Sequence, residues 1–164
     1  MKVIFSHGKE TGPLGSKITY LAEIAKAQGF EIESIDYRES MDPEWRVKRL
    51  LEMAGKQRDL VLVGSSMGAY VSTIAASQLQ PRGLFLMAPA FYLPGYAEQA
   101  PTAPQCPVSI VHGWRDEVVP VEHAIRFAQQ FKSSLHILDS DHGLGDALQP
   151  LGKLFDHFLQ SLHQ

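Results

Sequence analysis

Short apolar segments rich in β-branched residues alternate along the chain with longer segments of helical periodicity. This alternation is typical of a parallel sheet whose strands are joined by helices. The second apolar segment carries glutamates at alternate positions, which predicts a strand nearer the sheet edge, whereas the third is apolar throughout, as in a strand covered on both faces. Six segments have the strand pattern: residues 3–5, 30–37, 60–63, 84–87, 108–111 and 135–138.

Helical spacing of the apolar residues predicts five or six helices among these strands. Ser16 is placed to cap the first helix. Asp42 and Pro43 predict the start of the second helix, as a capping side chain followed by proline at the first helical position. The buried stripe of that helix is predicted to consist of Val47, Leu50, Leu51 and Ala54.

The opposite face of the second helix is basic. A solvated helix face and a basic binding patch have the same composition. We therefore interpret this face as exposed to solvent, with its four basic residues Arg46, Lys48, Arg49 and Lys56.

Residues 88–107 do not follow the alternation. The segment contains five prolines together with Phe91, Tyr92 and Tyr96. Such a composition predicts an ordered loop that lies over one end of the sheet. It is the only candidate lid in the chain.

Length and charge narrow the class of protein. A chain of 164 residues fits a single domain, which we assign to residues 1–164. A formal net charge of −3 offers no attraction to nucleic acid or to anionic membranes, and no segment has the length of a signal sequence or of a membrane span. Because Cys106 is the one cysteine, no internal disulfide forms, and a cytoplasmic protein is expected.

A G-x-S-x-G pattern directly follows the third strand and directly precedes a helix. In this arrangement the central residue, Ser66, lies on a strained turn that exposes its hydroxyl, while the flanking Gly64 and Gly68 leave room for the turn. Ser66 is therefore the candidate nucleophile. The backbone N–H of Met67, at the positive end of the following helix, is a candidate donor to an oxyanion.

A serine nucleophile needs a base, and histidine titrates in the suitable range. Of seven histidines, His142 lies in a polar turn after the last strand. Loops at the carboxyl ends of parallel strands share one rim, so His142 is expected to meet Ser66. His7 and His112, each before a glycine at a strand end, are interpreted as bracing their loops. The remaining histidines, for which no motif argues, are His123, His136, His157 and His163.

The third catalytic group should be a carboxylate that orients the histidine. Asp116 follows the fifth strand on the same rim and lies between Ser66 and His142 in chain order. Its rivals are Glu117, Asp139 and Asp141.

A second oxyanion donor is expected in the loop after the first strand. The backbone N–H of Lys9 is the first candidate and that of Glu10 the second. No cluster of residues has the spacing of a metal site, and no phosphate-binding loop is present.

Serine elbow, then acid, then histidine is the chain order of the α/β-hydrolases, which this sequence resembles over nearly its whole length. Within the superfamily it is similar to small bacterial esterases and thioesterases that lack a cap domain. The resemblance implies a three-layer fold with helices on both faces of a minimal six-stranded parallel sheet in the order 2-1-3-4-5-6. The chain departs from the family's pattern at its start, since it opens with what would be the family's third strand, and no large cap is expected. The pocket would then be shaped by Phe91, Tyr92, Tyr96 and Trp114.

The resulting expectation is a serine hydrolase acting on small carboxylic esters or thioesters, with a small acyl compound as its partner, no cofactor, and a monomeric or homodimeric state. Two alternatives remain open. An aminopeptidase or amidase needs an acidic group to hold an amine, for which Glu10 is the only hint. A non-catalytic interaction protein could also retain the fold.

Overall fold

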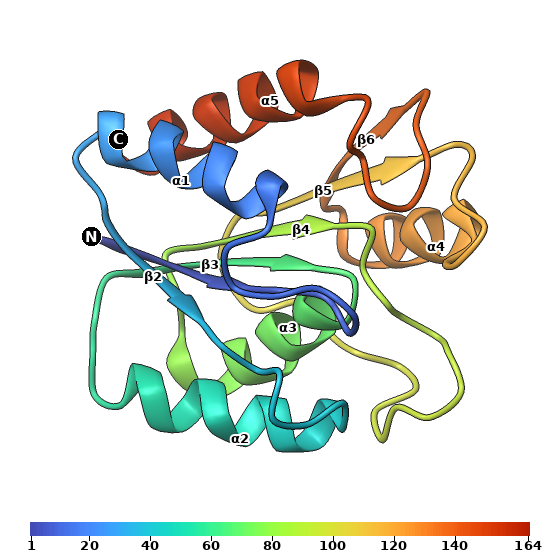
Figure 1. The fold of residues 1–164 in the computed structure, drawn as a ribbon, viewed down its shortest axis with the longest axis horizontal. Helices are drawn as coiled ribbons and strands as arrows, with labels where there is room; N and C mark the ends of the chain where they lie inside the picture. Colours follow the sequence, from blue (N-terminus) through green and yellow to red (C-terminus); the bar gives the residue numbers. More distant parts are fainter.

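Six parallel strands form one central sheet in the computed structural model, which describes residues 1–164 (Figure 1). The strand order is β2-β1-β3-β4-β5-β6, which confirms the predicted topology. β3 lies beside β1 and β4, and all its residues are buried, as its continuous apolar run predicts. The strands are β1 (Lys2–Ser6), β2 (Glu31–Ile35), β3 (Leu60–Ser65), β4 (Gly83–Met87), β5 (Val108–Gly113) and β6 (Ser134–Leu138).

Five helices cover the two faces of the sheet. α1 (Ser16–Ala27) and α5 (Leu148–Ser161) pack side by side on one face (Figure 1). α2 (Pro43–Ala54), α3 (Met67–Leu79) and α4 (Val121–Phe131) cover the other face, where they share one apolar core with the sheet. The result is the three-layer α/β fold that was expected. None of the helices combines the length and apolar character needed to span a lipid bilayer.

The predicted start of α2 is confirmed and that of α1 is wrong. The Asp42 side chain accepts a hydrogen bond from the backbone N–H of Glu44 at 3.0 Å, and Pro43 is the first helical residue. Ser16, in contrast, is already inside α1. Gly15 occupies the capping position, and no side chain caps that end of the helix.

The prediction of a fully solvated basic face on α2 is also wrong at one residue. Arg46 is only 1% exposed. Arg46 and the buried Leu50 are four residues apart and therefore lie on the same side of the helix. Lys48 is exposed, as the sequence predicts, and Arg49 is half-buried.

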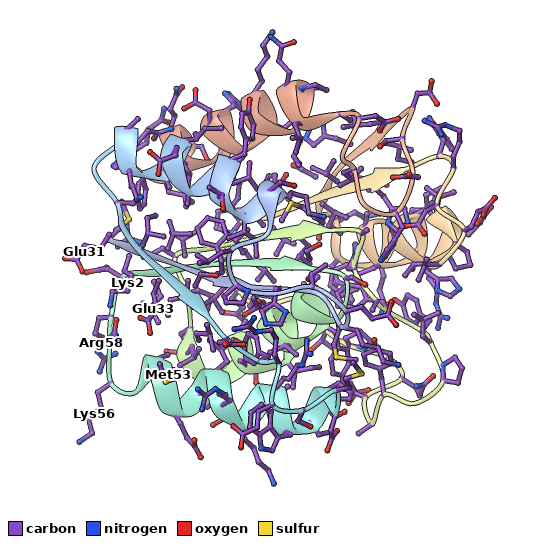
Figure 2. All side chains as sticks on the ribbon, viewed as in Figure 1. Lys2, Glu31, Glu33, Met53, Lys56 and Arg58 are labelled. Atoms are coloured by element: carbon purple, nitrogen blue, oxygen red, sulfur yellow. The ribbon has the colours of Figure 1, made fainter.

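The carboxyl ends of all six strands point to one edge of the sheet, and the loops after β1, β3, β5 and β6 meet there (Figure 1). The opposite edge, where the strands begin, carries an ion pair in which Lys2 Nζ lies 3.3 Å from Glu33 Oε2 (Figure 2).

Residues 88–107 form the predicted loop without regular helix or strand. Two side chains tie the loop to the helices beneath it. Tyr70 Oη donates to Glu44 Oε1 at 2.7 Å and accepts from the Glu98 N–H at 3.0 Å. Glu44 Oε2 also accepts from the Ala97 N–H at 3.3 Å. These hydrogen bonds hold the loop against α2 and α3, near the edge of the sheet where the strands end.

Candidate active site

Ser66 lies at the turn between β3 and α3, with φ 56° and ψ −117°. A non-glycine residue with positive φ is strained, and this strain turns the side chain out of the sheet. The flanking glycines allow the tight turn, because a Cβ on Gly64 would lie 2.3 Å from the Gly68 carbonyl oxygen, and a Cβ on Gly68 would lie 1.9 Å from that of Ser6. Only hydrogen fits at either position.

A continuous chain of hydrogen bonds joins three loops at the carboxyl edge. His142, after β6, has its Nε2 atom 2.9 Å from Ser66 Oγ and its Nδ1 atom 2.7 Å from Oδ2 of Asp116, which follows β5. An ionised carboxylate only accepts hydrogen bonds, so Nδ1 carries the proton. Nε2 is then free to accept the proton of the serine hydroxyl.

The Asp116 side chain has no exposed surface and is fully hydrogen-bonded. The backbone N–H groups of Val118 and Val119 donate to Oδ1 at 2.8 and 2.7 Å, while Oδ2 faces His142 and, at 3.1 Å, His112 Nε2. Burial raises the pKa of Asp116, but the hydrogen bonds from the two histidines and the two amides outweigh it and hold the pKa well below its usual range. The carboxylate therefore stays charged at neutral pH.

The three carboxylates considered as alternatives to Asp116 make no hydrogen bond to His142. Asp139 is exposed and pairs with Arg115, and Asp141 accepts from the Gly143 N–H. Glu117 is exposed. His7 and His112 brace their loops as interpreted: His7 Nδ1 donates to the Gly8 carbonyl at 2.8 Å, and His112 Nε2 donates to the Val119 carbonyl at 2.9 Å.

Two backbone amides are available beside Ser66. Met67 is the first residue of α3, so its N–H has no acceptor within the helix. The loop after β1 approaches from the other side, since a Cβ on Gly8 would lie 3.6 Å from Ser66 Cβ. Lys9 follows directly and lines the cavity next to the serine. Both predicted oxyanion donors thus belong to segments that lie beside the nucleophile.

A cavity of about 600 Å³ opens at Ser66 and His142. One part of its wall is polar and comes from residues 7–17, while the rest is mostly apolar. Tyr96, which was predicted to shape the pocket, lines it. The apolar wall consists of Ile18, Ala90, Leu93, Tyr96, Val118 and Val119.

The other three predicted pocket residues do not line this cavity, and their assignment is wrong. Phe91 is fully buried and packs on Phe127 with ring centroids 4.6 Å apart. Tyr92 is covered by α4, because the guanidinium of Arg126 lies 3.8 Å from its ring centroid. Trp114 is 59% exposed. Packing against α4 thus holds the first two rings away from the serine, Phe91 through an apolar contact and Tyr92 beneath the guanidinium of Arg126.

Lys17, which sequence reasoning missed, also lines the cavity. Its Nζ atom donates to the Gly143 carbonyl at 3.2 Å, next to His142. Burial lowers the pKa of Lys17 to about 8, although the charges of Asp116 and Asp141 oppose this effect. A lysine in the first turn of a helix gives no sequence signal, because solvated lysines are common there.

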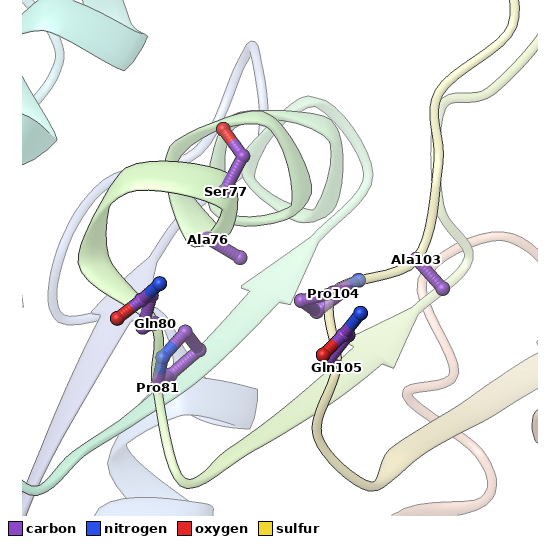
Figure 3. Close-up of a pocket in the computed structure, with 7 residues that line it drawn as sticks. All are labelled: Ala76, Ser77, Gln80, Pro81, Ala103, Pro104 and Gln105. Atoms are coloured by element: carbon purple, nitrogen blue, oxygen red, sulfur yellow. The ribbon is translucent and has the colours of Figure 1, made fainter.

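A second cavity lies away from the candidate triad, between the end of α3 and the segment that leads into β5 (Figure 3). It is lined by small, proline and amide side chains and has no titratable group. This second cavity therefore offers no acid or base for catalysis.

Comparison with known proteins agrees with this fold. The family model described as phospholipase/carboxylesterase matches residues 46–148. The chain belongs to this family of α/β-hydrolases. The hydrolase is 36% identical to a solved α/β-superfamily protein from Xanthomonas campestris pv. campestris, over 98% of this chain and 99% of that one, with a TM-score of 0.91. No curated protein sequence matches it.

More distant structures share the fold of this hydrolase. Est1E from Butyrivibrio proteoclasticus is 18% identical over 98% of this chain and 87% of that one, with a TM-score of 0.81. The α/β hydrolase domain-containing protein 10 from mouse is 20% identical over 98% of this chain and 90% of that one, with a TM-score of 0.78.

Proposed function

We propose that this hydrolase cleaves small carboxylic esters or thioesters through an acyl-enzyme intermediate on Ser66. The observation that carries the proposal is the unbroken hydrogen-bond chain from Ser66 Oγ through His142 to Asp116, at 2.9 and 2.7 Å. Its partner is a small acyl compound, and the reaction uses no cofactor.

The reaction proceeds in two acyl transfers. Ser66 Oγ attacks the substrate carbonyl carbon while its proton passes to His142 Nε2. Asp116 stabilises the resulting imidazolium, and the N–H groups of Met67 and Lys9 stabilise the negative oxygen. His142 then gives the proton to the departing alkoxide or thiolate. Water, deprotonated by His142, attacks the acyl-enzyme and releases the carboxylic acid and the free serine.

The cavity wall favours esters over aminopeptidase substrates. An aminopeptidase needs an acidic group for the substrate's ammonium. Glu10 is the one acidic residue of the wall, and Lys9 and Lys17 line the same cavity. The balance of charge is therefore positive and disfavours a cationic substrate.

A substrate panel with matched variants tests the proposal. The wild type is expected to hydrolyse nitrophenyl esters and acyl thioesters but not aminoacyl anilides. Asp116→Asn removes the acceptor that fixes the histidine tautomer, so kcat should fall on the order of 10⁴-fold. Asp139→Asn, an exposed control on the neighbouring loop, should stay within about twofold. Equal activity of Asp116→Asn and wild type would refute the proposed triad.

A further inference from the structure

Arg46 is a buried cation with no acidic partner. It is 1% exposed, and no carboxylate lies within ion-pair distance of its guanidinium. Burying an unpaired charge is costly unless its donors are all well hydrogen-bonded. The groups that Arg46 binds therefore indicate what the charge is retained for.

Those groups are three backbone carbonyls. Arg46 Nε donates to the Ser40 carbonyl at 2.8 Å. The two arms of the guanidinium donate to consecutive carbonyls of the loop after β1, with Nη1 2.9 Å from the Gly8 oxygen and Nη2 3.2 Å from the Lys9 oxygen. A forked, planar donor is suited to hold two adjacent peptide groups at once.

Holding these carbonyls also fixes the direction of the amides. Every peptide bond of the chain is trans, so the C=O and N–H of one peptide group point in opposite directions. The Gly8 carbonyl is held by Arg46 and by His7 Nδ1, which turns the Lys9 N–H away from the guanidinium. Because Arg46 Nη2 holds the Lys9 carbonyl, the Glu10 N–H also points away from the guanidinium.

The turned peptide lies beside the nucleophile, because a Cβ built on Gly8 would lie 3.6 Å from Ser66 Cβ. A positive charge behind the carbonyl also polarises the peptide group and strengthens its N–H as a donor. Donors that are fixed before the reaction stabilise an oxyanion without reorganisation.

We propose that Arg46 is a positioning residue that holds the Gly8 and Lys9 carbonyls so that the loop presents its amide to the oxyanion formed at Ser66. The inference rests on the proposed ester hydrolysis. It assigns a catalytic consequence to a residue of α2 that contacts neither the substrate nor the triad.

Kinetics of two Arg46 variants test the inference against a matched control. Arg46→Met removes the charge and all three donors, whereas Arg46→Lys keeps the charge but loses the fork. Arg49 lies on the same helix and also donates to a backbone carbonyl, that of Asp36 at 3.1 Å. Arg49→Met is therefore the control. Each variant is assayed for kcat and KM on nitrophenyl acetate, for folding by circular dichroism, and for inhibition by a trifluoromethyl ketone.

The trifluoromethyl ketone separates positioning from simple stability. Ser66 adds to its carbonyl and yields a hemiketal whose oxygen occupies the oxyanion position, so its affinity reports the donors directly. We expect Arg46→Met to lower kcat by roughly tenfold to a hundredfold with KM within about twofold, and to weaken the ketone by a similar factor. Arg46→Lys should recover part of the kcat and part of the ketone affinity, and Arg49→Met should change neither quantity.

Folded Arg46 variants with wild-type kcat and ketone affinity would overturn this inference alone. If Arg46→Met does not fold, the Arg46→Lys variant decides by the same two readouts. An equal loss of kcat and ketone affinity in Arg49→Met would also overturn the inference, since the effect would then be general destabilisation. A wild-type chain inert towards esters and the ketone would overturn the proposed function together with the inference.

Discussion

His112 Nε2 lies 3.1 Å from Asp116 Oδ2, and neither side chain has any exposed surface. The same Nε2 donates to the Val119 carbonyl, so it carries the proton and His112 Nδ1 is left without a partner. His112 is thus a shared donor behind the carboxylate that orients His142. It binds the acid loop to its own strand and keeps Oδ2 in place for the imidazole.

Replacement of His112 by phenylalanine removes this donor and keeps an aromatic ring, slightly larger, at the position. A hydrogen bond to a buried charge contributes about 1.5–3 kcal/mol, so the free energy of unfolding should fall by about that amount in urea titrations. Displacement of Asp116 should lower kcat about tenfold. His136→Phe, at a half-buried histidine of β6, is the control. Equal effects of the two substitutions would contradict the assignment.

Lys17 predicts a specific pH dependence of stability. Its pKa of about 8 in the folded chain lies below the value of ~10.4 expected in the unfolded chain. Between these values the unfolded chain holds more protons, so this contribution to the free energy of unfolding increases with pH from about 8 to about 10.4. Below about pH 8 Lys17 destabilises the fold by a constant amount.

The free energy of unfolding of Lys17→Met minus that of the wild type should therefore decrease as the pH rises from about 8 to about 10.4. Urea titrations at successive pH values measure it. Lys26→Met, on an exposed lysine of the same helix, should give a difference that stays nearly constant. A flat difference for Lys17→Met would contradict the burial of its charged amine.

Tyr96 should restrict the length of the acyl group, since it lines the apolar part of the cavity. Tyr96→Ala enlarges this part and should raise the ratio of kcat/KM for nitrophenyl hexanoate over acetate by about tenfold. Trp114→Ala should leave the ratio within about twofold, because Trp114 does not line the cavity. A larger change of the ratio in Trp114→Ala than in Tyr96→Ala would contradict this cavity and support the pocket residues predicted from the sequence.

Much of the fold follows from local patterns, and the triad follows from topology. Parallel strands bring their carboxyl ends together, so Ser66, Asp116 and His142 could be placed on one rim before their distances were known. The aromatic residues of the loop 88–107 could not be placed, because a proline-rich segment has no periodicity that shows where a ring points. Phe91 and Tyr92 instead pack toward α4.

Arg46 and Lys17 show the same limit for charged residues. A basic residue on an amphipathic helix is exposed in most cases, and the sequence does not show which loop will cover it. Arg46 is buried because the loop after β1 offers two consecutive carbonyls to its guanidinium. That contact joins segments far apart in the chain and has no counterpart in local spacing.

Gly68 should tolerate no side chain, because a Cβ there would lie 1.9 Å from the Ser6 carbonyl oxygen. Gly68→Ala is expected to destabilise the chain by more than about 3 kcal/mol or to prevent folding, as overpacking against backbone cannot relax. Gly145→Ala is the control, since nothing lies within 4 Å of the added methyl group. Thermal unfolding of both variants gives the comparison. A Gly68→Ala variant as stable as Gly145→Ala would contradict the close approach of α3 and β1.

The central claim is that Ser66 is a nucleophile activated by His142, and covalent labelling tests it most directly. Incubation with a fluorophosphonate followed by peptide mass mapping should give one adduct per chain, on Ser66. Labelling should be absent in Ser66→Ala, slowed by orders of magnitude in His142→Ala, and unchanged in Ser77→Ala on the same helix. An adduct on another residue, or equal labelling of Ser66→Ala and wild type, would contradict the account.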